Sequence, residues 1–249
     1  MPLPPFSAVL CCRHGGNVVC AWAVPDDCDG LIVERARCPN ADSGCDALPV
    51  VGVASGGADG KSLEDSLRRF GSCVEVAFGK LLSGANMMET LERDGLYMAL
   101  STATAYSIEP ARAFCKVLST RLGLSAALRD SIELAVHEAV VNGVMHGNLE
   151  VSSDERETFS RFQNYCDQIE LNLADPELRA RRIEVFGTWD EAAIMVSVVD
   201  SGAGYDLKAL AHNNNPNRKS GRGLTLIGGL SQEVTIGDGG RQLTMRFDR

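Results

Sequence analysis

The chain has 249 residues, with 33 acidic and 24 basic side chains and a formal net charge of −9. This balance argues against nucleic-acid binding, which needs a dense array of Lys and Arg to neutralise phosphates. Hydrophobic residues make up 45% of the sequence and aromatic residues 6%. The composition is therefore that of an ordinary globular protein, and it argues against a disordered chain and against a base-stacking platform.

No apolar run approaches the roughly 20 residues that a membrane-spanning helix needs. The start, Met1–Pro5, lacks the basic and apolar regions of a secretory signal. The sequence therefore predicts a cytoplasmic protein without membrane association. The nine cysteines form no C-x-x-C pair, so we expect buried free thiols in preference to a zinc site or a disulfide framework.

The first ninety residues contain short apolar runs of strand length that are separated by turns. Strands are expected at Ser7–Cys12, Asn17–Ala23, Gly30–Glu34, Pro49–Ala54 and Cys73–Phe78, and helices at Ser62–Phe70 and Ala85–Arg93. Strands that alternate with helices favour a small α/β domain, which we assign to residues 1–92.

The later part of this region, with Pro49–Ala54, a helix, Val74–Phe78 and Lys80, resembles the second half of a response-regulator receiver domain. A receiver needs acidic residues after its first strand to hold Mg²⁺, but here that strand ends in Cys11–His14. The resemblance therefore implies a shortened receiver that cannot be phosphorylated. The alternative is an unrelated α/β module that docks a partner.

The pattern changes after residue 92. Leu96–Ala105 is a strand candidate, and Glu109-Pro110 opens a helix that ends at Gly123. Ser125 is expected to cap a second, longer helix that runs to about Gly147. The apolar residues of this second helix recur at i, i+3 and i+4 spacing, so one of its faces is expected to pack on a sheet.

The second helix also carries Glu138, Asn142 and His146, which are four residues apart and share one face. A carboxylate can accept a proton, and an amide oxygen is a suitable ligand for Mg²⁺. Such a row indicates a site for a metal-bound phosphate. The alternative is a solvated stripe on an amphipathic helix.

An apolar strand candidate, Ala192–Val199, is followed by Asp200, Gly202 and Gly204. The glycines allow a tight turn and the close approach of a flat ligand, and the Asp200 carboxylate can accept a hydrogen bond from an exocyclic amine. A plain turn has a similar composition.

A further glycine motif, Gly221 to Leu224, stands at the start of another helix. Free N–H groups and the positive end of the helix dipole bind phosphate there, and Arg222 can add a charge-assisted contact. The alternative is a glycine-rich loop that only precedes a helix. The polar, Asn-rich segment 207–220 between the two glycine motifs is a candidate lid.

These motifs occur in the order of the N, G1 and G2 boxes of GHKL (Bergerat-fold) ATPases, which residues 96–249 resemble. The boxes are Glu138-x-x-x-Asn142, Asp200-x-Gly202-x-Gly204 and Gly221-x-Gly223. The amino-acid sequences of these boxes are most similar to those of anti-sigma-factor serine kinases and of the related ATP-binding modules attached to bacterial response regulators. The fold this implies for residues 93–249 is an α+β sandwich, a mixed sheet with helices on one face.

The resemblance also implies ATP and Mg²⁺ as cofactors. Asp200 would hold the adenine amino group, Asn142 would coordinate Mg²⁺, and Glu138 would be the catalytic base that activates a hydroxyl or water. The other residues implied in ATP binding are His146, Gly202, Gly204, Gly221, Arg222, Gly223, Leu224 and, on the terminal strand, Thr244.

About fifty residues separate the N box from Asp200, more than in compact anti-sigma kinases. This helical insert, at about 150–183, contains Ser153–Leu173, whose Phe159, Phe162 and Ile169 recur at helical spacing. Another short helix is expected to begin at Asp175-Pro176. We expect the apolar stripe to pack on the core, with partner binding as the alternative.

The function implied by the resemblance is that of an ATP-dependent serine/threonine protein kinase in a bacterial partner-switching pathway. It would phosphorylate a small anti-sigma antagonist protein and hold or release a sigma factor, and a homodimer is compatible with this role. One alternative is a module that binds ATP without catalysis. Another is the catalytic part of a two-component histidine kinase, which is disfavoured because His137 lies on the motif helix itself.

Overall fold

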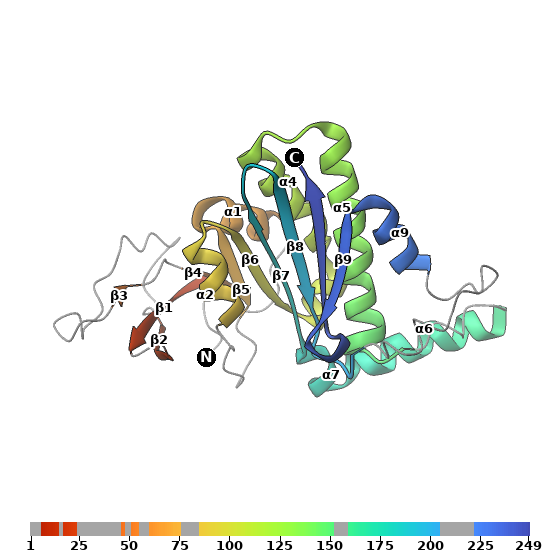
Figure 1. The fold of residues 1–249 in the computed structure, drawn as a ribbon. Helices are drawn as coiled ribbons and strands as arrows, with labels where there is room; N and C mark the ends of the chain where they lie inside the picture. The colour runs from red at the N-terminus through yellow and green to blue at the C-terminus, as the bar shows by residue number, and fades with distance from the viewer. Residues whose placement is uncertain are drawn as a thin grey trace.

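The computed structural model describes residues 6–14, 17–23, 46–47, 51–54, 60–75, 85–151, 159–204 and 222–249. Within these ranges, ten strands form one mixed sheet (Figure 1). The strand order is β2-β1-β4-β5-β6-β7-β8-β10-β9, and β3 pairs with β1. The strand expected at Gly30–Glu34 lies outside the described residues.

The N-terminal part of the sheet contains strands β1 (Phe6–His14), β2 (Asn17–Ala23), β3 (Asp46–Ala47), β4 (Val51–Ala54) and β5 (Ser72–Glu75), with helix α1 (Gly60–Phe70) between the last two. β4 and β5 are parallel, but β1 pairs antiparallel with both β2 and β4. A doubly wound sheet of the receiver type is mostly parallel. The pairing of β1 therefore favours the alternative interpretation, an unrelated α/β module.

The remaining elements are α2 (Ala85–Glu92), β6 (Leu96–Ser101), α3 (Thr102–Ser107), α4 (Pro110–Leu122), α5 (Ala126–Asn142), the π-helix η2 (Gly143–Asn148), α6 (Phe159–Ala174), α7 (Pro176–Ala180), β7 (Arg182–Trp189), β8 (Ala193–Val199), α9 (Arg222–Leu230), β9 (Glu233–Gly237), the 3₁₀ turn η4 (Asp238–Gly240) and β10 (Gln242–Asp248). β6, β7, β8, β10 and β9 follow one another in antiparallel pairs. Together with the parallel pairs β4–β5 and β5–β6, these antiparallel pairs confirm the predicted mixed sheet.

Local signals explain several helix boundaries. Pro110 occupies the first turn of α4, and Gly123 ends that helix in the left-handed conformation with φ 63°. The Ser125 side chain accepts a hydrogen bond from the Leu128 N–H and so caps α5. The strand expected over Leu96–Ala105 is too long, because the Ser101 side chain accepts a hydrogen bond from the Thr104 N–H and starts α3.

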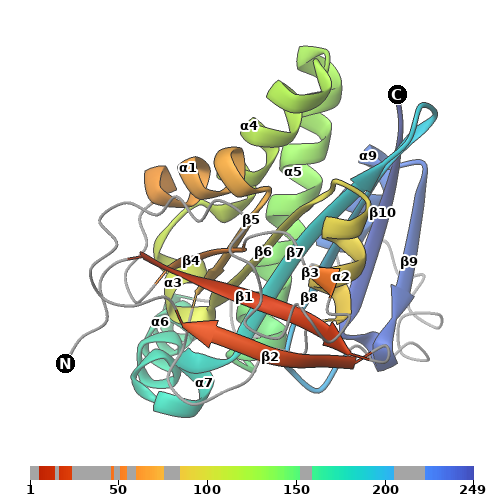
Figure 2. The ribbon, with the colours of Figure 1, turned by 90° about the vertical axis from the view of Figure 1, so that its left-hand side faces the viewer.

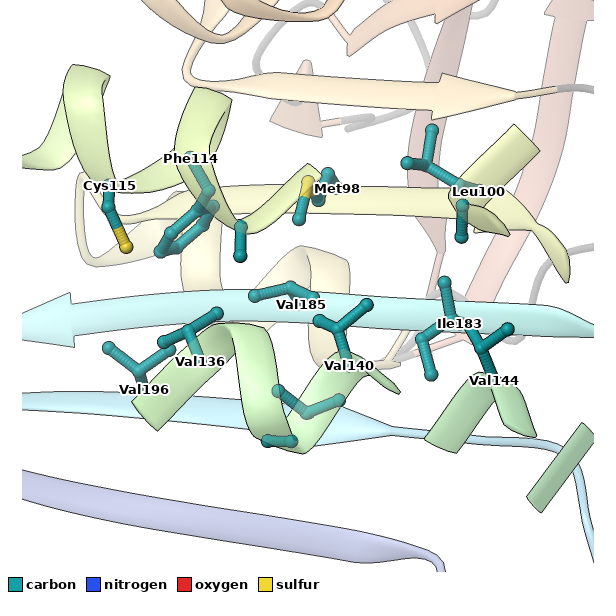
Figure 3. Close-up of a cluster of buried hydrophobic side chains, with 14 of the residues drawn as sticks. Met98, Leu100, Phe114, Cys115, Val136, Val140, Val144, Ile183, Val185 and Val196 are labelled. Carbon is teal, nitrogen blue, oxygen red and sulfur yellow. The ribbon is translucent and has the colours of Figure 1, made fainter. Parts of the chain in front are cut away.

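Helices α1, α4 and α5 cover one face of the sheet, and α4 and α5 run side by side (Figure 2). Figure 3 shows Val136, Val140 and Val144 of the α5–η2 helix against Ile183 and Val185 of β7. All five side chains are buried. Their burial removes apolar surface from water and fixes the helix on the sheet.

Helix α2 lies on the other face of the sheet. Its Asn86 donates a hydrogen bond of 3.2 Å to Glu184, and Glu184 alternates along β7 with the buried Ile183 and Val185. Successive strand residues point to opposite faces. Helices α1, α4 and α5 therefore lie on the face of the sheet opposite α2.

The sheet and core run across the boundary predicted at residue 92. β5 pairs in parallel with β6, and Leu63, Leu67 and Cys73 belong to the same buried cluster as the side chains of α4 and α5. The division into two domains stays a prediction. Among the described helices, none has the length and hydropathy of a membrane span.

The helical insert contributes side chains to this core. Tyr165 and Ile169 of α6 are buried, and Cys166 and Leu173 pack against the same cluster. Core packing of the predicted apolar stripe is confirmed for Cys166, Ile169 and Leu173, and the Phe159 side chain lies outside the described residues. Phe162 is different, because 53% of its surface stays exposed.

Candidate functional site

The start of α9 lies directly against the helix face that carries Glu138 and Asn142. A Cβ atom added to Gly223 would lie 2.8 Å from Asn142 Nδ2 and 3.2 Å from Glu138 Oε2. A side chain at this position would therefore require the ends of the Asn142 and Glu138 side chains to shift. The first N–H groups of α9 have no partner within the helix, and the positive end of its dipole faces a carboxylate and an amide.

Asp200 follows β8 and stands against the π-helix η2. A Cβ atom added to Gly147 would lie 2.5 Å from both Cγ and Oδ1 of Asp200. The Asp200 side chain is only 9% exposed, and its Oδ1 accepts a hydrogen bond of 2.8 Å from the Gly202 N–H. Burial raises the pKa of this carboxyl above its usual value, and the Gly202 hydrogen bond opposes that rise.

The two glycines after Asp200 also stand at close approaches. A Cβ atom on Gly202 would meet the Gly147 carbonyl oxygen at 2.3 Å. Gly204 adopts a positive φ of 84°, and a Cβ atom there would lie 2.3 Å from the Gly239 carbonyl oxygen. The turn after β8 is thus held between η2 and η4 by backbone packing that larger residues would disrupt.

The motif helix changes its geometry within the site. It was expected to continue as one helix to about Gly147, but from Gly143 to Asn148 it is a π-helix. The Leu149 N–H donates to the Val144 carbonyl, five residues earlier, at 2.9 Å. Single π turns are rare and occur frequently at functional sites.

His146 contacts the loop that follows η2. Its Nδ1 lies 2.6 Å from the Val151 carbonyl oxygen, and the Val151 N–H donates to the Met145 carbonyl at 2.9 Å. The π turn also changes the angular position of His146 relative to Asn142, so the straight row expected from four-residue spacing is interrupted. The structure gives His146 a loop-bracing contact, and its role in ATP binding stays a prediction.

Thr244 is not brought to Asp200. It pairs with Ser197 of β8, and the two hydroxyl oxygens are 2.8 Å apart. Its neighbours Leu243 and Met245 point into the core beneath the helices, so Thr244 lies on the opposite face of the sheet. The residues next to it on the strand face the helices instead, and the role of Thr244 in ATP binding stays a prediction.

Three further predicted residues belong to the G2 motif. Leu224 is partly buried and packs against the core cluster, so it anchors the start of α9. Gly221, the Arg222 side chain and the candidate lid at 207–220 lie outside the described residues.

Sequence reasoning missed Asn148, which connects three segments of the site. Its side chain is completely buried. The amide nitrogen donates to Thr102 Oγ1 at 2.9 Å and to the Arg182 carbonyl at 3.0 Å, and the amide oxygen accepts from the Ser201 N–H at 2.7 Å. The only sequence signal is an Asn at the end of the motif helix, because its partners are distant in the sequence.

The described residues fit a metal ion that is bound partly by the protein and partly by the phosphates of a ligand. They fit an ion that is bound by protein side chains alone less well. They contain no group of three or more His, Cys, Asp or Glu side chains that could bind an ion. Mg²⁺ is commonly held by one or two protein oxygen ligands together with substrate phosphates and water. The Asn142 amide, next to the start of α9, has the chemistry for this arrangement.

Comparison with known families matches residues 101–247 to the histidine kinase-like ATPase domain. The chain belongs to this family. The match runs from the end of β6 into β10 and includes all three motifs. Domains of this type bind ATP, usually with Mg²⁺, and have kinase- or ATPase-type activity. No curated protein matches the chain.

Proposed function

We propose that this protein is an ATP-dependent serine/threonine protein kinase that regulates a bacterial partner-switching pathway in the cytoplasm. The observation that carries the proposal is the contact of Gly223 with Glu138 and Asn142. It puts a proton acceptor and a metal-binding amide at a helix start that is suited to phosphate. In this family, such a place is where the triphosphate of ATP would be bound.

Asp200 would recognise the adenine. Its carboxylate is nearly buried, and Gly147 and Gly202 pack next to it without side chains, which leaves room for a flat ring. One carboxylate oxygen is engaged by the Gly202 N–H, and we infer that the carboxylate also accepts a hydrogen bond from the exocyclic amine. Gly204 would keep the turn in its shape, while Asn148 would hold Ser201 and so the direction of Asp200.

Catalysis would depend on placing the γ-phosphoryl group next to the attacking hydroxyl and on stabilising the charge of the phosphates. Mg²⁺, when bound, neutralises charge on the phosphates, and the Asn142 amide oxygen would be its protein ligand. Gly223, with Gly221 and Arg222, would surround the phosphates. Glu138 would orient the attacking Ser or Thr hydroxyl of the protein substrate and accept its proton.

The kind of protein partner is inferred from the similarity of the motif sequences to those of anti-sigma-factor kinases. The substrate would be a small antagonist protein with an accessible Ser or Thr, and a sigma factor or a comparable regulator would be the protein that is held and released. A homodimer would present the same surface twice. A module that binds ATP without catalysis is the second candidate, and Glu138 distinguishes the two.

The substitution Glu138→Gln tests the proposal, since it keeps the shape of the side chain and removes the base. We expect ATP binding, measured by calorimetry, to be retained. The rate of phosphoryl transfer from labelled ATP to a small protein of the bacterial extract should fall by about 10²- to 10⁴-fold. Glu133→Gln, on the same helix, is the matched control and should leave transfer unchanged.

Transfer that persists in the Glu138→Gln variant would show that another group is the base. ATP binding without transfer in the wild-type protein would favour the non-catalytic module. Absence of ATP binding would contradict both candidate functions.

A further inference from the structure

A cavity of about 350 Å³ lies on the side of the α5–η2 helix away from Glu138 and Asn142. Its walls come from α3, the start of α4, α5, η2 and α6. Ala105, Val140, Val144 and Met145 form a floor of buried side chains. Because the floor is held by the main core, the cavity is preformed, and its volume lies within the range of small-molecule sites.

The lining indicates the chemistry of the occupant. Among the described residues that line the cavity, none is Asp, Glu, Lys or Arg, and the polar side chains are His137, Tyr106 and Tyr165. A charged ligand would lose its hydration without gaining a partner ion. The cavity therefore suits a neutral, apolar molecule, with aromatic rings at the mouth to stack on it.

Two aromatic side chains at the mouth stay exposed, Tyr106 at 48% and Phe162 at 53%. Exposed aromatic side chains beside an apolar cavity are typical of a binding site. A stable protein interface needs on the order of 800 Å² on each partner, which two aromatic residues do not supply. The cavity has room for a small molecule, whereas the two exposed rings beside it offer little surface to a protein. We therefore favour a small molecule as the occupant.

The wall of this cavity is also the wall of the nucleotide site. Val140, Val144 and Met145 line the cavity, whereas Gly143 and Gly147 of the same helical segment contact Asp200. An occupant that packs against the first group holds the π turn in place. This turn positions Asp200, so the nucleotide would meet a site that is already ordered.

We propose that this cavity is a regulatory site for a neutral apolar small molecule, whose binding tightens the binding of nucleotide on the other side of α5. The existence of the site is independent of the proposed function. The regulatory effect rests on it, because it requires nucleotide binding.

The neutral fluorophore N-phenyl-1-naphthylamine tests the site on the full chain without nucleotide. We expect saturable binding of one molecule per chain, which Val141→Phe abolishes because the larger ring fills the cavity. Phe162→Ala, a change at the exposed mouth, should weaken binding even if the first variant does not fold. The control Leu171→Ala, on the same helix α6 but 66% exposed and outside the lining, should bind as the wild type does.

Non-saturable fluorescence, or equal affinity in the Val141→Phe and wild-type proteins, would overturn the site. So would light scattering that shows a dimer which excludes the fluorophore and is broken by Val141→Phe, since a second copy would then occupy the cavity.

The regulatory effect is tested by calorimetry of a non-hydrolysable ATP analogue with Mg²⁺, with and without saturating fluorophore. We expect an affinity increase of about 5-fold or more, the lower end of common allosteric couplings. An unchanged affinity would overturn the regulation. Saturable fluorophore binding in a protein that binds no nucleotide would instead contradict the proposed function and leave the site intact.

Discussion

At Gly147 the absence of a side chain allows the Asp200 carboxylate to stand against the helix. A Cβ atom there would overlap Asp200 Cγ at 2.5 Å. Gly147→Ala should displace the carboxylate and lower the affinity for ATP by about 10-fold or more, which corresponds to roughly 1.4 kcal/mol. Calorimetry measures the affinity, and overpacking should also lower the unfolding free energy by about 1–3 kcal/mol.

The matched control is Gly228→Ala in α9, where an added Cβ atom would have no neighbour within 4 Å. It should leave ATP affinity unchanged and stabilise the protein by about 0.4–1 kcal/mol through the unfolded chain. Equal affinities of the Gly147→Ala and wild-type proteins would show that Asp200 does not contact the nucleotide.

Asp200 also makes nucleotide binding depend on pH. Its carboxylate form would accept the hydrogen bond from adenine, and burial raises the pKa of this group. ATP affinity should therefore decline on acidification at a pH above the usual Asp value of about 3.9. Calorimetric titrations over pH measure the decline, and Asp200→Asn should bind more weakly and show only the pH dependence of the nucleotide itself.

The stability of the free protein should change in the opposite sense. A raised pKa means that the folded state binds this proton more tightly than the unfolded state does. The Asp200 contribution to stability is thus present at low pH and is lost as the pH rises through the folded pKa. If the unfolding free energy fell with rising pH to the same extent in the wild-type and Asp200→Asn proteins, the pH dependence would belong to other groups.

At the scale of elements, prediction succeeded where the signal was local. Pro110, Gly123 and Ser125 are adjacent to the backbone groups that they cap, and the boundaries of α4 and α5 followed from them. The π turn and the face of Thr244 could not be predicted in this way. They depend on packing against Ile183 and on the pairing register with β8, which involve residues distant in the sequence.

Asn148 provides the test for the π turn. Asn148→Ala removes three hydrogen bonds and leaves the Ser201 N–H and the Arg182 carbonyl without this partner. The Arg182 carbonyl still accepts a hydrogen bond from Ser201 Oγ, so we expect a total loss of about 1–3 kcal/mol in unfolding free energy, measured by urea denaturation. ATP affinity should fall as well, because Ser201 adjoins Asp200.

The exposed Ser107→Ala variant is the control and should change the unfolding free energy by less than about 0.5 kcal/mol. A wild-type unfolding curve for Asn148→Ala would show that the π turn does not depend on the Asn148 side chain.

At the scale of the whole molecule, the family match begins at residue 101, yet the core beside it includes Leu67 of α1. Leu67→Ala should lower the unfolding free energy of the matched region by about 2–5 kcal/mol. The fluorescence of Trp189 on β7, in a Trp22→Phe background, reports this region. Leu171→Ala is the exposed control. An unchanged Trp189 transition would show that α1 belongs to a separate folding unit.

The order of the three motifs was enough to predict the family and the layer of helices on the sheet. The sequence could not reveal that strands from both predicted domains share one sheet, since strand pairing between β5 and β6 is a tertiary property.

The expectation of buried free thiols is confirmed for Cys73 and Cys115. Burial raises the pKa of Cys73 to about 11, so this thiol is protonated and inert near neutral pH.

The π turn has a consequence for how the length of this segment can vary. A π turn contains one residue more than the α-helical path between the same two ends. Deleting a single residue between Asn142 and Asn148 would restore that path, and the residues between the two ends, which include Gly143 and Gly147 against Asp200, would take new directions. We expect insertions and deletions in related chains to be absent from this interval.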